Sequence, residues 1–499
     1  MLKPKGPHVK KPKKFDYNLI VIGAGSAGLV SSYIASTLKA KVALIEKHKM
    51  GGDCLNTGCV PSKALIRSAK VYHYMNRARQ FGFQSGEIKF EFSEVMDRIR
   101  RVIKKVEPHD SVDRYTKLGV DCIHGNAVIK SPYTVEINGT TLTTRAIIIA
   151  TGAKPFVPPL PGLNQIHYLT SDNLWDLQTQ PKKLVVLGGG PIGIELAQSF
   201  ARLGSEVTIV EMAPRILIRE DDDVADLVVQ KLKKDGLHLR TSHRAESVVV
   251  EDGKKILLAS HKDQIVKLEF DEILVAIGRK ANISGFGLEE LGVSLNQRGT
   301  IDHNDFLQTN FENIFVCGDV AGPYQFTHTA AHQAYYACVN ALLHPFTKWI
   351  PSPFNKSLKV DYSVIPWATY CDPEIATVGL TEKAAKQKNL AYEITTYSID
   401  DLDRAIADEE DYGLVKVLTQ PGSDRILGAT IVAHNASDLI VEFIAAMKHG
   451  FGLGDILSTI HIYPTMAEAN KYLAGNWKKA RVPEKLLIWT EKFFSWLRG

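Results

Sequence analysis

The sequence predicts an α/β protein with two Rossmann-like dinucleotide-binding units and a further α+β domain. Its 499 residues are enough for about three domains. A pattern of apolar strand, glycine-rich turn, helix and second strand occurs twice, and the two turns begin 165 positions apart (23 to 188). In both copies an acidic residue follows the third glycine by 18 positions (28 to 46, 193 to 211). One such motif is weak evidence, but two complete units in the same register indicate two dinucleotide sites.

The first unit begins with the apolar, β-branched residues 17–22, which are typical of a buried parallel strand. Gly23 permits the tight turn that follows, Gly25 lets backbone N–H groups approach a pyrophosphate, and Gly28 lets helix and strand pack closely. Glu46 ends the second strand and can accept hydrogen bonds from a ribose diol. We therefore expect one dinucleotide at Gly23, Gly25, Ser26, Gly28 and Glu46.

The second unit repeats this plan with Gly188, Gly190 and Gly193 in the turn and Glu211 at the end of the second strand. A carboxylate at this position favours the free ribose 2′-OH of NAD and repels the 2′-phosphate of NADP. Arg215, four residues later, is a cation that partly offsets this repulsion. We therefore expect NAD(H) to be preferred over NADP(H).

Composition and charge exclude several classes of protein. Hydrophobic residues make up 45% and charged residues 23% of the chain, as in ordinary globular proteins. The net charge is only +5, and lysines concentrate in the basic tail 1–15, where we expect solvated chain and no nucleic-acid partner. No apolar run reaches the ~18 residues that a membrane span needs. Six scattered cysteines do not form a secreted disulfide framework, so a cytoplasmic protein is expected.

Cys54 and Cys59 follow the first unit closely and form a candidate redox couple. Pro61 suits the first turn of a helix, and the pattern predicts helix over 60–69. A helix N-terminus lowers the pKa of a thiol, which is what a redox cysteine requires. Two buried cysteines or half of a zinc site are the alternatives. No second Cys/His cluster with ligand spacing occurs, so no metal site is expected.

With these features the chain resembles the flavin disulfide reductases, which include dihydrolipoamide dehydrogenase, glutathione reductase and mercuric reductase. The resemblance runs from about residue 15 to about residue 473 and rests on separated motifs in the family's order. These motifs are 147–152 with Thr151 and Gly152, 273–279 with Gly278, and 313–319 with Asp319, whose carboxylate would hold the flavin ribityl chain. The resemblance therefore implies FAD at the first nucleotide unit and NAD(H) or NADP(H) at the second.

The resemblance also implies a division of the chain and a homodimer. The parts are a basic tail 1–15, an FAD-binding domain 16–153 and 282–355, an NAD(P)-binding domain 154–281, a C-terminal α+β dimerisation domain 356–478, and a helical extension 479–499. Within the dimerisation domain, residues 413–418 and 426–432 predict a meander of alternating strands.

The family's roles carry over to matching positions of this sequence. Cys59 would lie against the flavin as the charge-transfer thiolate, and Cys54 would be the interchange thiol that meets the acceptor. Lys63 and Glu195 would form an ion pair near flavin N5, where hydride from NADH arrives before the electrons pass to the disulfide. The helix that starts beside His328 would point its N-terminus at the flavin N1/O2 edge.

The chain departs from the family at Tyr463, which stands where dithiol-using members carry a catalytic histidine. An unperturbed tyrosine has a pKa of ~10 and is poorly suited to proton transfer near neutrality. Glu468, which would orient the imidazole, is present, and His461 is a less favoured substitute. Mercuric reductases also have tyrosine here, but their C-terminal cysteine pair has no counterpart after Cys371. Efficient Hg(II) detoxification is therefore not expected.

These observations predict an NAD(P)H-dependent flavin disulfide reductase that acts on a thiophilic metal ion or a disulfide-like small molecule. A dihydrolipoamide dehydrogenase with an atypical base is one alternative, and a redox-responsive FAD/NADH binding protein is another. In the helical extension, Leu486, Trp489, Phe493 and Trp496 recur at helical spacing. Packing of this helix on its own dimer is the first expectation, and weak contact with a membrane surface or a partner is the second.

Overall fold

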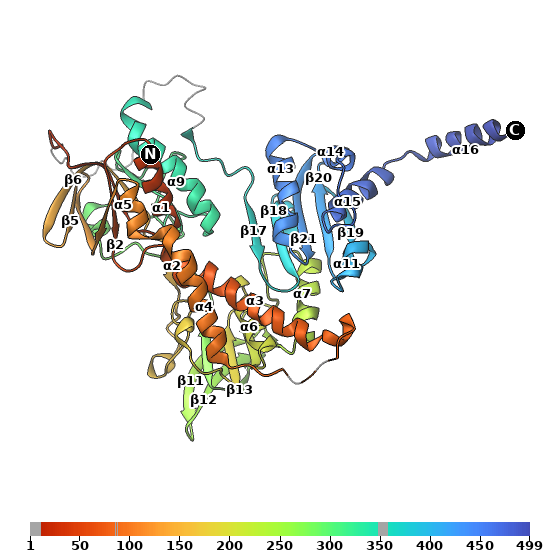
Figure 1. Cartoon of the computed structure of the whole chain (residues 1–499), viewed down its shortest axis with the longest axis horizontal. Helices are drawn as coiled ribbons and strands as arrows, with labels where there is room; N and C mark the ends of the chain where they lie inside the picture. Colours follow the sequence, from red (N-terminus) through yellow and green to blue (C-terminus); the bar gives the residue numbers. More distant parts are fainter. Residues whose placement is uncertain (1–10, 85, 87, 348–357) are drawn as a thin grey trace.

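The computed structural model describes residues 11–84, 86, 88–347 and 358–499. Residues 1–10 of the basic tail and 348–355 of the expected FAD-binding segment lie outside this range. The described chain forms two α/β units and an antiparallel sheet covered by helices, with one further helix projecting from it (Figure 1).

The first α/β unit is a seven-stranded sheet in the order β3-β2-β1-β6-β5-β4, with β16 also paired to β6. The strands are β1 (Tyr17–Ile22), β2 (Val42–Glu46), β3 (Val120–His124), β4 (Ala127–Ser131), β5 (Thr134–Ile137), β6 (Thr140–Ile149) and β16 (Ile314–Val316). β6 serves two purposes, because its first half pairs antiparallel with β5 and its second half pairs parallel with β1 and β16.

Alternation along β1 divides the core of this unit between the two faces of the sheet. Leu19 and Val21 pack with the helices α1 (Ser26–Thr37) and α9 (Thr327–Thr347), which also pack on each other. Ile20 and Ile22 pack on the opposite face with residues of β4 and β5. Because both faces are covered, β1 reads as a continuous apolar run rather than an alternating one.

The second α/β unit has the parallel order β10-β9-β8-β14, which repeats the order β3-β2-β1-β6 of the first. Its elements are β8 (Lys183–Leu187), α6 (Pro191–Arg202), β9 (Glu206–Glu211), α7 (Asp222–Lys234), β10 (His238–Thr241) and β14 (Glu272–Val275). A separate antiparallel sheet is formed by β11 (Arg244–Glu251), β12 (Lys254–His261) and β13 (Gln264–Phe270). The predicted repeat of strand, turn, helix and strand is therefore present in the fold.

The chain leaves the first unit and returns to it through one narrow ribbon. β7 (Ala153–Pro155) carries the chain out and β15 (Arg279–Ala281) brings it back, and the two strands pair antiparallel with Ala153 opposite Ala281. The second unit is thus inserted at a single point of the first.

The C-terminal sheet has the order β17-β18-β21-β20-β19 and is antiparallel throughout. Its strands are β17 (Pro366–Thr369), β18 (Glu374–Gly379), β19 (Glu393–Ser398), β20 (Leu414–Thr419) and β21 (Ile426–Ala433). The two segments predicted as meander strands, 413–418 and 426–432, correspond to β20 and β21, and these strands pair antiparallel. The whole sheet is not a meander, because β18 pairs with β21 rather than with β19. The helix α10 (Glu382–Gln387) follows β18, and β19 is placed at the far edge of the sheet.

The remaining helices connect and cover these sheets. They are α2 (Gly52–Asn56), α3 (Cys59–Asn76), α4 (Phe92–Val106), α5 (Val112–Lys117), α8 (Leu288–Leu291), α11 (Asp403–Ala407), α12 (Ala436–Leu439), α13 (Val441–His449), α14 (Leu453–Ser458), α15 (Glu468–Lys479) and α16 (Glu484–Arg498). The helix predicted over 60–69 is longer than expected at its C-terminal end. Among the described helices, none combines the length and the apolar character that crossing a bilayer requires.

A buried ion-paired junction joins α3, the inserted unit and the C-terminal sheet. Arg202 of α6 donates from Nε to Asp235 (2.8 Å) and from Nη1 to Asp372 (2.7 Å), and its side chain is only 4% exposed. Lys70 of α3 approaches Asp372 from the other side, with Nζ 3.2 Å from Oδ1. Burial alone would raise the pKa of Asp372, but Arg202 and Lys70 hold it well below its usual range.

Candidate active site

Cys54 and Cys59 line one cavity of about 640 Å³. Residues of the first glycine-rich turn, the acid Glu46, the pair Lys63 and Glu195, and Asp319 line the same cavity. A volume of this size is typical of small-molecule and cofactor sites. The structure therefore brings a dithiol and a predicted dinucleotide site into one space.

Local backbone geometry places the two cysteines at adjacent helix ends. Cys54 lies in the short helix α2, and Cys59 is the first residue of α3. The side-chain amide of Asn56 donates to the carbonyls of Met50 and Gly52 (both 2.9 Å), which fixes the start of α2. Gly52 has φ +54°, and a Cβ on it would lie 2.6 Å from Cα of Gly25. Only glycine lets the redox segment approach the nucleotide turn this closely.

Hydrogen bonding distinguishes the two thiols. The hydrogen bond from the Cys54 thiol is the main cause that lowers the pKa of Cys59 to about 6. Burial opposes this effect, while the Thr327 hydroxyl, 3.2 Å from Sγ, and the charge of Lys63 add to it. The same pairing, together with burial, raises the pKa of Cys54 far above its ordinary value. In the reduced pair Cys59 is thus the thiolate, and this order of pKa values is the one that the predicted roles require.

Lys63 and Glu195 form a close ion pair beside the cysteines. Lys63 Nζ lies 2.9 Å from Glu195 Oε2, with side-chain exposures of 38% and 7%. The other carboxylate oxygen, Oε1, accepts from the backbone N–H of Tyr370 (2.9 Å). The ring of Tyr370 lies under Lys63, with Nζ 4.3 Å from the ring centroid. The ion pair is therefore held from both the inserted unit and the C-terminal sheet.

We expect the long-wavelength absorbance of the two-electron-reduced, FAD-loaded enzyme to disappear as the pH falls through about 6. The pKa of Cys59 is lowered from its ordinary value, so the thiolate exists above that pH and is protonated below it. Lys63 lowers this pKa and Glu195 raises it. Lys63→Met should therefore move the midpoint up, and Glu195→Gln should move it down. Spectra recorded over pH 4.5–9 check this, and a common midpoint in all three proteins would contradict it.

The glycines of the first nucleotide turn are required by close packing. Gly23 has φ +102°, and a Cβ on Gly28 would lie 1.8 Å from the carbonyl oxygen of Gly23. Glu46 closes the turn, because its carboxylate accepts from the backbone N–H groups of Ala24 (2.7 Å) and His48 (2.8 Å). Ser26 is the first residue of α1 and lines the cavity together with these groups.

The second turn has the same geometry. Gly188 has φ +107°, and a Cβ on Gly193 would lie 2.1 Å from the carbonyl oxygen of Gly188. Glu211 accepts from the backbone N–H groups of Gly189 and Ala213 (both 2.7 Å), as Glu46 does in the first copy. Gly190 has open space on its side-chain side, which leaves the backbone free to meet a ligand. The glycines of this second turn and Glu211 do not line the cavity around the cysteines, which the inserted unit reaches through α6 and through residues 171–176.

Thr151, Gly152 and Asp319 line the cavity as predicted cofactor residues would. The Thr151 hydroxyl donates to the carbonyl of Asn282 (2.7 Å). This bond joins the segment that follows β6 to the segment that follows β15. Burial raises the pKa of Asp319, and Arg279, with Nε 3.7 Å from its carboxylate, partly offsets this. Gly278 has φ +131° and precedes Arg279 at the ribbon, outside the cavity lining.

The other predicted residues lie away from the cavity within this chain. The His328 ring faces the carbonyl of Pro366 (Nε2 to O 2.9 Å) and stacks on Phe326. Tyr463 is 65% exposed and donates its hydroxyl to Asp403 (2.9 Å). Glu468 is buried and accepts from the Thr465 N–H (3.2 Å). A homodimer that brings the partner subunit to the site would be needed for Tyr463 and Glu468 to act there.

His461 is not placed as a substitute for the missing histidine. Its Nε2 lies 2.9 Å from the Glu442 carboxylate and its Nδ1 lies 3.0 Å from the carbonyl of Thr459. Both ring nitrogens thus have acceptors, and the side chain is 6% exposed. An imidazole held in this way supports the local loop and is not presented to a substrate.

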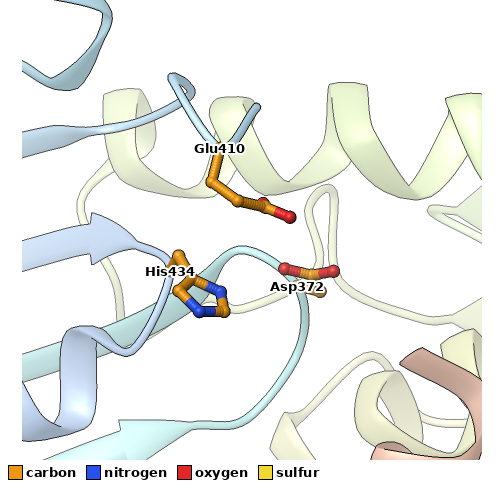
Figure 2. Close-up of side chains that lie close together, drawn as sticks. All are labelled: Asp372, Glu410 and His434. Carbon is orange, nitrogen blue, oxygen red and sulfur yellow. The ribbon is translucent and has the colours of Figure 1, made fainter. Parts of the chain in front are cut away.

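Three potential ligands gather outside the cavity, although no metal site was predicted. Asp372, Glu410 and His434 point toward one another, with ligand atoms within 4.8 Å (Figure 2). The ammonium of Lys70 lies 3.2 Å from Asp372 and 2.9 Å from Nδ1 of His434. Burial and Lys70 lower the pKa of His434. A cation is therefore already provided at this point by the protein, and the cluster belongs to the buried junction.

Sequence reasoning missed several residues that surround the cysteines. Thr327 contacts Cys59, Tyr370 contacts Lys63, and Arg279 pairs with Asp53 beside Cys54. Arg279 also donates to the carbonyl of Ala153 (2.7 Å). Asp53 is next to Cys54 and Arg279 belongs to the motif 273–279, so the sequence already indicated that both positions are near the site. Tyr370 had no such indication, because it is far away in the sequence.

The described residues fit an extended dinucleotide in the cavity. Glu46 and the first turn would provide the ribose and pyrophosphate contacts, and they line the same space as the cysteines, Lys63 and Asp319. The absence of a side chain at Gly25 and Gly52 keeps this space open. Two nucleotide folds around a dithiol define a nucleotide-dependent redox enzyme.

Comparison with known proteins gives the family. A family described as pyridine nucleotide-disulphide oxidoreductase matches residues 17–334, and its dimerisation domain matches residues 365–474. The chain belongs to this family. It is a flavin disulfide reductase that uses FAD and NAD(P)H, and the dimerisation domain supports a homodimer.

Individual relatives are named for different activities. A mercuric reductase of Bacillus cereus is 34% identical over 92% of this chain and 71% of its own length. A dihydrolipoyl dehydrogenase of Mycoplasma genitalium is 35% identical over 91% of this chain and 96% of its own. The Cu(II) complex of RclA, an HOCl-induced flavoprotein disulfide reductase of Escherichia coli, has a TM-score of 0.79 at 25% identity and covers 91% of this chain and 98% of that one.

Proposed function

We propose that this enzyme passes electrons from NAD(P)H to the Cys54–Cys59 disulfide and from the resulting dithiol to a thiophilic metal ion. A disulfide-like small molecule is the other acceptor in the proposal. The observation that carries it is the polarised cysteine pair beside the cavity, with the pKa of Cys59 lowered to about 6. Cysteine use in the sequence supports a cytoplasmic setting, where such a disulfide is catalytic rather than structural.

Each turnover moves two electrons. FAD, held at the first glycine-rich turn, would supply the transfer of the electron pair of NAD(P)H to the protein. The disulfide between Cys54 and Cys59 breaks as it takes up two electrons and two protons, which leaves two thiol groups, and Cys59 then releases one proton and becomes the thiolate. When one Hg(II) ion takes both electrons, or two Cu(II) ions take one each, the sulfur–sulfur bond forms again and the proton remaining on Cys54 returns to solvent. Lys63 stabilises the Cys59 thiolate between these steps.

The raised pKa of the Tyr463 phenol supports a metal ion over a disulfide as the acceptor. Its hydrogen bond to Asp403, with the charge of that carboxylate, raises the pKa of the phenol above its ordinary value. A base with so high a pKa removes a thiol proton poorly near neutrality. A mercuric reductase and a Cu(II) complex among the similar proteins are consistent with this choice.

An anaerobic NADH titration followed by an acceptor screen tests the proposal. Long-wavelength absorbance should appear at two electrons per FAD. Hg(II) or Cu(II) should reoxidise the enzyme, and so remove this absorbance, faster than glutathione disulfide or lipoamide does. A purified protein that takes up no FAD would contradict the flavin assignment. Discharge by disulfides alone would contradict the metal-ion acceptor.

A dihydrolipoamide dehydrogenase with an atypical base is the second candidate. The dihydrolipoyl dehydrogenase relatives and the presence of a buried Glu468 favour it. In this case Tyr463→His should raise the rate of dihydrolipoamide oxidation with NAD by roughly 10²-fold, the usual contribution of a positioned general base. Negligible activity in both proteins would remove this candidate.

We expect the enzyme to use NADH better than NADPH by at least about tenfold in kcat/KM, because Glu211 repels a 2′-phosphate. Arg215 does not offset this charge freely, since Asp222 (3.5 Å from Nε) and Asp226 already pair with it. Glu211→Ala should reduce the preference, whereas Glu206→Ala, an exposed change on the same strand, should not. Steady-state kinetics with both nucleotides measure it, and equal use by the unaltered enzyme would contradict it.

A further inference from the structure

The helix α16 exposes an unusual amount of apolar surface. It has 15 residues, none of which is buried, and it projects from the C-terminal sheet away from the rest of the chain (Figure 1). Its aromatic rings contact one another, with Trp489 stacked on Phe493 at 5.4 Å between centroids. The large exposed side chains are Leu486, Leu487, Ile488, Trp489, Phe493, Phe494, Trp496 and Leu497. An exposed apolar patch of this kind marks a site that binds another surface.

Apolar and charged residues are separated around the helix axis. At about 100° per residue, the apolar side chains other than Ile488 fall within about half of the circumference. The charged residues and Ser495 occupy the other half together with Ile488. An apolar arc of this width is broader than the a/d seam that two paired helices bury.

The charge beside the apolar face is positive. The exposed cations of α16 and the end of α15 are Lys478, Lys479, Lys485, Lys492 and Arg498. None of these five pairs with an acidic group among the residues that the structure describes. The acids of α16 are Glu484 and Glu491. Three cations against two acids on α16, together with Lys478 and Lys479 at the end of α15, give this end of the described chain an excess of positive charge, which is complementary to an anionic surface.

We propose that α16 lies flat on the surface of an anionic phospholipid membrane, with its aromatic face in the interface and its cations at the headgroups. Trp and Phe on one face with Lys and Arg on the other are the composition of interfacial helices. The helix is about 22 Å long, too short to cross a hydrocarbon core of ~30 Å. A homodimer presents two such helices, so their binding is reinforced by effective concentration. This inference goes beyond the proposed function and is independent of the acceptor.

Vesicle sedimentation of the full-length, FAD-loaded enzyme tests this. The protein should sediment with vesicles of phosphatidylglycerol and phosphatidylcholine, and roughly tenfold less with phosphatidylcholine alone or in high salt. Trp489→Glu with Phe493→Glu should abolish sedimentation. Ile488→Glu with Ser495→Glu adds the same charge to the polar half of the helix and should retain most of it. NADH-dependent turnover should be unchanged in both variants.

Two results would overturn the proposal. One is the absence of sedimentation with anionic vesicles. The other is a monomer in solution for the Trp489→Glu and Phe493→Glu variant where the unaltered enzyme is a dimer, which would show that α16 covers a second copy of the chain. Light scattering of both variants distinguishes this outcome.

Discussion

Cys59→Ser is expected to reduce NADH-driven turnover by roughly 10³-fold or more while FAD stays bound. Serine has nearly the size of cysteine, but it forms no disulfide and cannot replace the Cys59 thiolate. Cys59 contributes only one of many groups to the cavity lining, so the cavity remains. Flavin content, measured from the absorbance of the purified protein, should be close to that of the unaltered enzyme. Full turnover of a metal ion or a disulfide by this variant would contradict the proposed route.

Cys54→Ser separates the roles of the two sulfurs. Acceptor reduction should again be lost, but Cys59 can no longer be tied in a disulfide, so its thiolate persists without NADH. Long-wavelength absorbance is therefore expected in oxidised Cys54→Ser and not in Cys59→Ser. Cys122→Ser, at a half-buried cysteine of β3, is the matched control and should keep full turnover. Absorbance in the opposite variant would reverse the two assignments.

Arg202→Met should destabilise the protein by about 3–5 kcal/mol at pH 7, because it leaves the buried Asp235 without its cation and takes from Asp372 one of its two cations, Lys70 being the other. Asp235 and Asp372 both bond to the guanidinium, and their side chains are 3% and 9% exposed. Arg404→Met is the control, since Arg404 and Asp408 form an exposed pair within one helical turn. Its loss should cost less than about 0.5 kcal/mol. Urea unfolding of the FAD-loaded proteins compares the two.

The pH dependence of this loss has a definite sign. The pKa of Asp372 is depressed in the folded enzyme, so its contribution to stability is present above the ordinary aspartate pKa and is lost as the pH falls through the folded value. In Arg202→Met that contribution is reduced, because only Lys70 then holds the pKa of Asp372 down. The difference between the two proteins should therefore shrink as the pH falls below about 4. A loss below about 1 kcal/mol at pH 7 would contradict the view that Arg202 stabilises this junction.

The local parts of the fold were predictable because each has its own signal in the chain. The apolar run 17–22, the turn at Gly23 and the acid at Glu46 each follow from residue type and spacing, and the structure has strand, turn and strand there. The cysteines and Lys63 were found for the same reason, since they lie in one short segment. The pairing of β20 with β21 was predictable for the same reason. The order of the whole C-terminal sheet was not, because β21 also pairs with β18, more than forty residues away.

Contacts between distant parts of the chain were not predictable from the same signals. Tyr370 reaches Lys63 and Glu195 from the C-terminal sheet, and Thr327 reaches Cys59 from the start of α9. Asp372 and His434 meet Lys70 in the same way. Each of these residues is common in an ordinary loop or helix end, and only the packing of three units gives it a partner. Packing of α16 on the dimer, the first expectation from the sequence, stays a prediction that the α16 variants test against a lipid surface.

The pairing of β7 with β15 has a consequence for how such a protein can evolve. The inserted unit begins and ends at one place, with Ala153 opposite Ala281. A segment whose ends meet can be exchanged, extended or trimmed as one cassette, while the strand register of its host sheet is preserved. If Glu211 sets the nucleotide preference as proposed, that preference can diverge within the cassette while the two cysteines stay unchanged in the host.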